Sequence, residues 1–136
     1  MPISNIGGGS QVGDGNLNEI ALRVVPVPAT ATATATLTAA QVTNGILLGS
    51  PGSSAAAYTL PLGTSMDTAL GNAKIGSSFD FSVVNVDGSG SGVITVTTNT
   101  GWTLVGLMTV AATAGTAQGF RARKTGVATW SLYRIS

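Results

Sequence analysis

The most regular alternation of apolar and polar residues lies in the middle of the chain. Phe79, Phe81 and Val83 alternate with polar residues, a pattern typical of a strand with one buried face. A turn rich in glycine and serine follows, and two further β-branched or aromatic stretches, at 93–98 and 102–105, read as strands. The pattern predicts an antiparallel meander.

Short strands are also predicted on both sides of this meander. The Ala and Thr residues of 29–36 alternate strictly, which predicts an edge strand or an extended connector with the small Ala side chains inward. Such a flat, uncharged edge favours pairing with another chain. The remaining predicted strands are 19–27, 46–48, 57–62, 108–110, 118–124 and 127–135, and the last two are joined by a turn at Thr125 and Gly126.

One helix is predicted after the strand at 57–62. Thr64 or Ser65 serves as its N-cap, and Asp67 lies in its first turn. Leu37 to Val42 could form one further helical turn. With about nine strands and one short helix, the expected fold is all-β, an antiparallel β-sandwich of jelly-roll type or a related barrel.

The predicted domain covers 19–136, and an extended glycine-rich arm covers 1–18. A segment with so few large side chains cannot bury enough surface to offset its ordering entropy. We therefore expect a neighbouring chain to hold the arm, with folding back on its own domain as the alternative. Its candidate contact residues are the isolated apolar positions Ile3, Ile6, Val12 and Leu17.

Charge is sparse, since only 8% of the residues are charged against about 25% in a typical soluble domain. Either Ser, Thr and Asn keep the surface wet, or part of it is buried against other chains, and we favour the second explanation. The net charge of +1 argues against a nucleic-acid partner. The expected protein has no signal peptide and no membrane span, because the N-terminus lacks a basic and apolar leader and no apolar run is long enough.

The sequence contains few residues that could carry out catalysis. The chain has no His and no Cys, which removes the commonest general base and the commonest metal ligands. Asp80, between two phenylalanines, is expected to face solvent and to pair with an arginine. A glycosidase-like pair of carboxylates could only come from Asp67, Asp80 and Asp87, and nothing in the pattern brings them together. We predict a protein that is not an enzyme and uses no cofactor.

The strongest charge feature is the basic cluster of Arg121, Arg123, Lys124 and Arg134. One interpretation is a surface that binds an acidic patch or a polyanion. The other is an ordinary solvated face.

The order of several segments resembles small virion proteins of tailed phages, especially phages of cyanobacteria and marine bacteria, of the head decoration or cement type. The resemblance covers about residues 37 to 136. It rests on Leu37–Val42, Tyr58–Pro61, the helix with Asp67, the Phe-Asp-Phe strand, Gly119–Gly126 and the closing Trp-Ser-Leu-Tyr-Arg.

This resemblance implies a β-sandwich that assembles, commonly as a homotrimer, on the outer surface of an icosahedral head. The partner would be the major capsid protein, and the protein would be made in the host cytoplasm. Residues 1 to 36 lie outside the resemblance, and we infer separately that the arm grips the capsid. The expected function is capsid decoration that stabilises the head by bridging capsid subunits. The alternatives are a tail fibre, spike or baseplate component, or a carbohydrate-binding β-sandwich with Trp102, Trp130 or Tyr133 exposed in a shallow groove.

Overall fold

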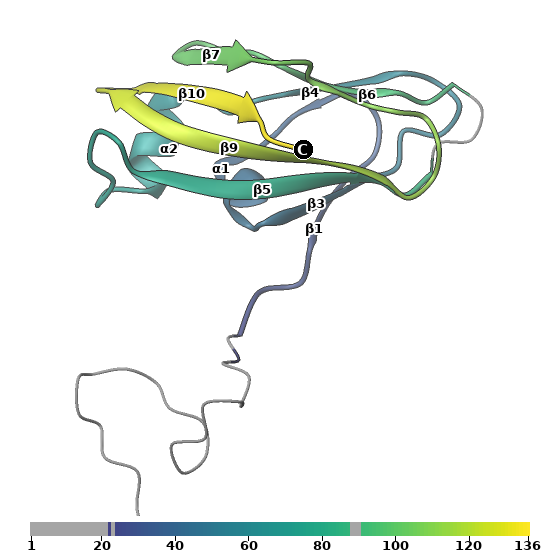
Figure 1. Ribbon diagram of the computed structural model, residues 1–136, viewed down its shortest axis with the longest axis horizontal. Coiled ribbons are helices and arrows are strands. Elements are labelled where there is room, and N and C mark those ends of the chain that lie inside the picture. Colours follow the sequence, from purple (N-terminus) through teal and green to yellow (C-terminus); the bar gives the residue numbers. More distant parts are fainter. Residues whose placement is uncertain (1–21, 23, 88–90) are drawn as a thin grey trace, which may run out of the picture.

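The computed structural model describes residues 22, 24–87 and 91–136, which form a mostly β structure of two sheets (Figure 1). This part of the chain holds ten strands and two helices, one helix more than predicted. The strands are β1 (Ala29–Ala31), β2 (Ala35–Thr36), β3 (Ile46–Gly49), β4 (Ala56–Thr59), β5 (Ser78–Asn85), β6 (Ile94–Thr97), β7 (Trp102–Val105), β8 (Thr109–Val110), β9 (Thr116–Gly126) and β10 (Thr129–Arg134), and the helices are α1 (Ala39–Thr43) and α2 (Gly63–Ala69).

The chain passes back and forth between the two sheets. The six-stranded sheet has the order β1-β3-β5-β9-β10-β7, and the four-stranded sheet has the order β2-β4-β6-β8. Odd-numbered strands up to β9 therefore belong to one sheet and even-numbered strands up to β8 to the other. Only β10 breaks the alternation, because it forms a hairpin with β9.

The first six strands form three stacked coils, each with one strand in either sheet. Successive coils pair in parallel, so that Ala29 lies beside Leu47 and Leu47 beside Val83. In the described residues, antiparallel pairing is limited to β5 with β9, β9 with β10 and β6 with β8. The all-β sandwich agrees with the prediction, whereas a jelly-roll topology is not confirmed. The predicted antiparallel arrangement is wrong, because five of the eight strand pairings in the described residues are parallel.

The predicted antiparallel meander is wrong, although its strands exist. β5 and β7 lie in the six-stranded sheet and β6 lies in the four-stranded sheet, so none of the three pairs with another. Alternation of apolar residues correctly gives the face that each strand buries. It carries no information about the sheet to which a strand belongs.

The inward faces of the two sheets build one hydrophobic core. Its largest fully buried side chains include Trp130, Tyr58 and Phe120, and each such side chain contributes about 1.5–3 kcal/mol by leaving water. β3 places Gly49 on this inward face, where a Cβ atom would come within 2.5 Å of the Ile94 side chain. A larger residue there would force the Ile94 and Tyr58 side chains of the four-stranded sheet to shift.

The alternating Ala and Thr stretch forms two short strands instead of one. β1 pairs in the six-stranded sheet, and after a break at 32–34 β2 pairs in the other. The buried Tyr58 hydroxyl holds this crossing by donating to the carbonyl oxygens of Ala31 and Thr32, at 3.1 and 2.9 Å. The expectation that Ala points inward holds for the buried Ala31, whereas Ala33 and Ala35 are exposed.

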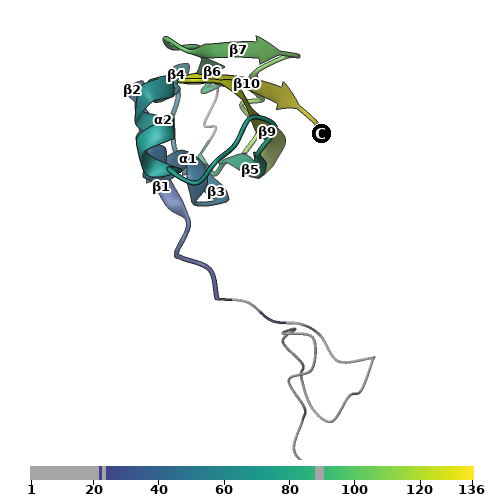
Figure 2. The same ribbon diagram turned by 90° about the vertical axis from the view of Figure 1, so that its left-hand side faces the viewer.

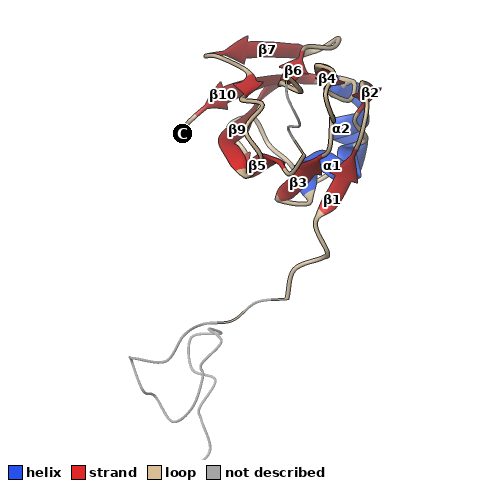
Figure 3. Cartoon of the chain, turned by 90° about the vertical axis from the view of Figure 1, so that its right-hand side faces the viewer, coloured by secondary structure: helices blue, strands red, loops and turns tan. Residues whose placement is uncertain are grey.

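Both helices lie together on one side of the molecule, beside the first strands of each sheet (Figures 2 and 3). α1 begins with a capping box, in which the Thr38 hydroxyl accepts from the Gln41 amide and the Gln41 side chain accepts from the Thr38 amide. The predicted cap of α2 is wrong, since the N-cap residue is Leu62 and makes no side-chain cap bond. In the described residues no helix is long and apolar enough to cross a membrane.

Candidate functional site

The four residues of the predicted basic cluster do not share one surface. In the six-stranded sheet, Asp80 pairs with Arg121 and Ser78 with Arg123, which places both arginines on the outer face. Lys124 lies on the opposite face of β9. Arg134 lies at the far end of β10 opposite the buried Phe120, and its guanidinium donates to the carbonyl oxygen of Leu107 at 3.2 Å. A single basic patch of all four residues is therefore wrong, and a binding role for Arg121 and Arg123 stays a prediction.

Asp80 faces solvent and pairs with an arginine, as expected. The Arg121 Nε and Nη2 atoms donate to its two carboxylate oxygens at 2.7 and 3.0 Å, and both side chains are about half exposed. The Arg121 hydrogen bonds lower the pKa of Asp80, and the same contact raises the pKa of Arg121. Exposed pairs of this kind contribute little to stability.

Asp67 connects α2 to the β9–β10 hairpin, which the sequence did not predict. Its carboxylate accepts from the Ala128 amide at 2.7 Å and from the Trp130 indole at 3.0 Å, and it lies 2.7 Å from the Lys124 ammonium group. The Lys124 hydrogen bond, followed by the Ala128 amide, lowers the pKa of Asp67. Because α2 begins at Gly63, Asp67 lies beyond its first turn.

The same hairpin turns at Val127 and Ala128, two residues later than the predicted Thr125 and Gly126. Ala128 has a φ of 52°, a conformation that L-residues rarely adopt. Gly63 and Gly101 pack against its carbonyl group, and a Cβ atom at either glycine would overlap the Ala128 oxygen. The turn is thus placed by α2 and the start of β7, and not by its own turn chemistry.

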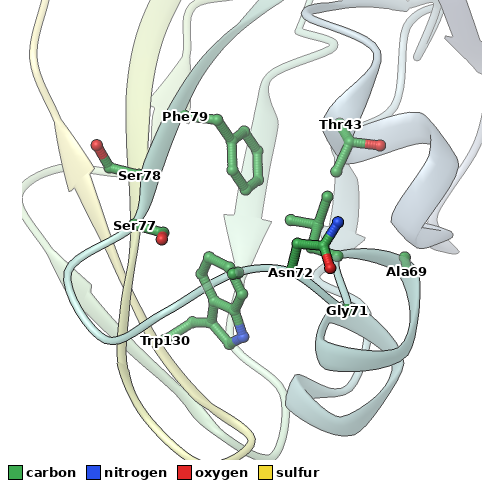
Figure 4. Close-up of a pocket in the computed structure, with 10 residues that line it drawn as sticks. Thr43, Ala69, Gly71, Asn72, Ser77, Ser78, Phe79 and Trp130 are labelled. Atoms are coloured by element: carbon green, nitrogen blue, oxygen red, sulfur yellow. The ribbon is translucent and has the colours of Figure 1, made fainter.

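A cleft of about 430 Å³ lies between the end of α2 and the start of β5 (Figure 4). The rings of Phe79 and Trp130 form one wall, packed edge to face with centroids 6.0 Å apart. Figure 4 shows the Phe79 ring directed across the gap toward Thr43 and Asn72. All ten described residues that line the cleft are uncharged: Thr43, Ala69, Leu70, Gly71, Asn72, Ala73, Ser77, Ser78, Phe79 and Trp130.

The tryptophans do not form the exposed groove expected of a carbohydrate-binding protein. Trp102 and Trp130 are 7% and 1% exposed. The Trp102 indole donates to the Pro61 carbonyl oxygen at 2.6 Å and the Trp130 indole to Asp67, so both indole groups serve the fold. Tyr133 lies half-buried on β10.

An apolar segment leaves the domain ahead of β1 (Figure 1). The predicted strand at 19–27 is wrong over its described residues 24–27, which lie outside both sheets. The Asn44 side-chain amide donates to the Val27 carbonyl oxygen at 2.9 Å and fixes the point of exit. Four large apolar side chains of this segment are exposed by 83%, 101%, 60% and 85%: Leu22, Val24, Val25 and Val27. The predicted arm contacts Ile3, Ile6, Val12 and Leu17 lie outside the described residues.

The described residues contain no group of three or more acidic, His or Cys side chains that could hold a metal ion. No known protein family, curated protein or solved structure matches the chain. The functional interpretation of the cleft and of the apolar segment therefore rests on their geometry alone. Residue patterns gave no sign of the cleft, because its walls come from three separate parts of the chain.

Proposed function

We propose that this chain is a structural assembly protein of a phage virion that decorates the outside of the head. In this proposal it acts as a homotrimer and bridges neighbouring subunits of the major capsid protein. The observation that carries the proposal is the apolar segment Leu22–Val27, whose described large side chains stand exposed beside a domain that has its own complete core.

Exposed apolar groups that lie together favour association with another surface. The low charge of the whole chain also favours association with other chains. The likeness of 37–136 to head decoration proteins supplies the specific partner, and a β-sandwich is the fold that this likeness implies.

The physical role would be stabilisation by multivalent binding. Each contact between one copy and the shell can be weak, because three linked copies raise the effective concentration of the remaining contacts. Ligands that bind the assembled shell and not its separated subunits stabilise the shell by mass action.

The test compares heads that lack the protein with heads to which it has been added back. Added protein is expected to raise the temperature at which the heads release DNA. A variant with Leu22→Ser, Val24→Ser, Val25→Ser and Val27→Ser should fold normally and lose most of this effect. The control, Ile75→Ser with Leu107→Ser and Val127→Ser, removes three apolar side chains of similar exposure elsewhere. Heads that resist heat equally with and without the protein would contradict the proposal.

The position in the virion can be measured separately by quantitative mass spectrometry. A decoration protein should occur in a fixed, high ratio to the major capsid protein. A tail fibre, spike or baseplate component should occur in far fewer copies.

A further inference from the structure

The cleft between α2 and β5 matches the exposed apolar segment in chemistry. We propose that residues Val24–Val27 of one copy pack into this cleft on a second copy. The inference deepens the proposed assembly role and rests on it, since it names the surface through which copies join.

The cleft offers an apolar floor with a polar rim. Leu70, Ala73 and the Phe79 ring can cover valine side chains, and the lining carries no charge among its described residues. Val24–Pro28 is likewise uncharged. Asn72 at the exposed rim carries an amide that donates and accepts, so it can pair with the backbone of an extended segment.

A copy does not fill its own cleft with these residues, since Val24, Val25 and Val27 are exposed. Val25 and Val27 each precede a proline, and a residue before proline is restricted to extended conformations. The backbone is therefore extended at Val25 and Val27, and at about 3.3 Å per residue Val24 lies at most about 10 Å from Val27. Figure 1 shows this part of the chain running away from the domain.

The point of exit and the cleft adjoin each other on the surface. Thr43 lines the cleft, and the next residue, Asn44, holds the Val27 carbonyl oxygen. A segment that docks on a neighbour therefore brings the two domains close together. Because segment and cleft are different surfaces, the contact is heterologous, and repetition about a rotation axis closes a ring. A homotrimer is such a ring.

Disulfide trapping tests the contact directly, because the chain has no cysteine of its own. Two full-length single variants, Val25→Cys and Asn72→Cys, are mixed, incubated to allow exchange of copies, and oxidised. The mixed disulfide between the two variants is measured on a non-reducing gel after labelling one of them. The matched control mixes Val25→Cys with Thr103→Cys, an exposed position on β7.

The first mixture should give about tenfold more mixed disulfide than the control, because docking raises the effective concentration of the two thiols. Equal yields in both mixtures would overturn the proposal. So would a double variant, Val25→Cys with Asn72→Cys, that forms its disulfide only within one chain. The experiment needs no phage head, so a failed contact between copies and a failed attachment to the shell are observed independently.

Discussion

A single carboxylate, Asp67, joins parts of the chain that are far apart in sequence. It accepts hydrogen bonds from residues 61 and 63 positions further on, and it also lies against Lys124. The Lys124 ammonium is also 5.8 Å from the centroid of the Trp130 ring, within the range of a cation–π contact. Three donors around one anion hold the hairpin against α2.

Asp67→Asn should therefore lower the melting temperature by several degrees at neutral pH. Because the folded-state pKa of Asp67 is depressed, its stabilising effect is fully present above the unfolded pKa of about 3.9 and is lost as the pH falls through the folded value. The difference in melting temperature between wild type and variant should shrink below about pH 4. Thermal unfolding followed by circular dichroism from pH 2 to pH 8 would measure it.

Asp80→Asn is the control for this experiment, since it removes an exposed ion pair. Its melting temperature should stay within about 2 °C of wild type at every pH. A loss at Asp67 that is the same at all pH values would contradict the assigned role of the charge.

The two aspartates also show which side-chain positions and contacts can be predicted from residue patterns. Asp80 could be placed from its neighbours, because flanking phenylalanines in a strand force it to the opposite face. The contacts of Asp67 could not be predicted in this way, because its partners belong to the β9–β10 hairpin, which several strands separate from α2 along the chain. The residues next to Asp67 in the sequence do not indicate which distant residues it contacts.

Among the elements, the crossing between β1 and β2 depends most on one side chain. The Tyr58 hydroxyl donates to two carbonyl groups there, and burial raises the pKa of Tyr58, which keeps the donor protonated. The Ala31 carbonyl oxygen has a second donor in the Ser50 amide at 2.9 Å. If the hydroxyl is removed, it is therefore chiefly the Thr32 carbonyl oxygen that loses a hydrogen bond.

Tyr58→Phe should lower the free energy of unfolding by about 1–2 kcal/mol, the usual effect of losing one buried hydrogen bond. Urea unfolding would measure it, and an unchanged slope with denaturant would show that the fold is the same. Tyr133→Phe, on the outer face of β10, should change the value by less than about 0.5 kcal/mol. Equal effects of the two changes would refute the role of the crossing.

The helical turn considered at 37–42 is found as α1, and most strands agree with the sequence patterns because period two is a local property. The pairing of strands and the place of the last turn do not. Thr125 and Gly126 have good turn chemistry, yet the chain continues in β9 through Gly126 and turns at Ala128. There the Asp67 carboxylate and two closely packed glycines decide the register.

In the whole molecule, successive strands of the chain alternate between the two sheets, so that the formation of each sheet depends on the other. Apart from the β9–β10 hairpin, strands adjacent in a described sheet are not consecutive in the chain. Neither sheet can form from one continuous stretch. The domain should therefore fold and unfold as one cooperative unit.

Two optical probes test this expectation. Both tryptophans lie in strands of the six-stranded sheet, β7 and β10, so fluorescence reports on that sheet, whereas far-ultraviolet circular dichroism reports on both. The two unfolding curves in urea should coincide. A fluorescence transition clearly separated from the circular dichroism transition would show that the sheets unfold independently.

The stacked coils leave β1 and β2 as edge strands of their two sheets, and both belong to the same turn of the chain. In the described residues, this end of the stack is thus a terminal rung with no strand beyond it. A tandem duplication of coding sequence could add further rungs here and leave every existing ladder in place. The last two strands of the chain have no such freedom, because β9 and β10 lie inside their sheet. Lineages of this protein should therefore differ in length mainly at the N-terminal end.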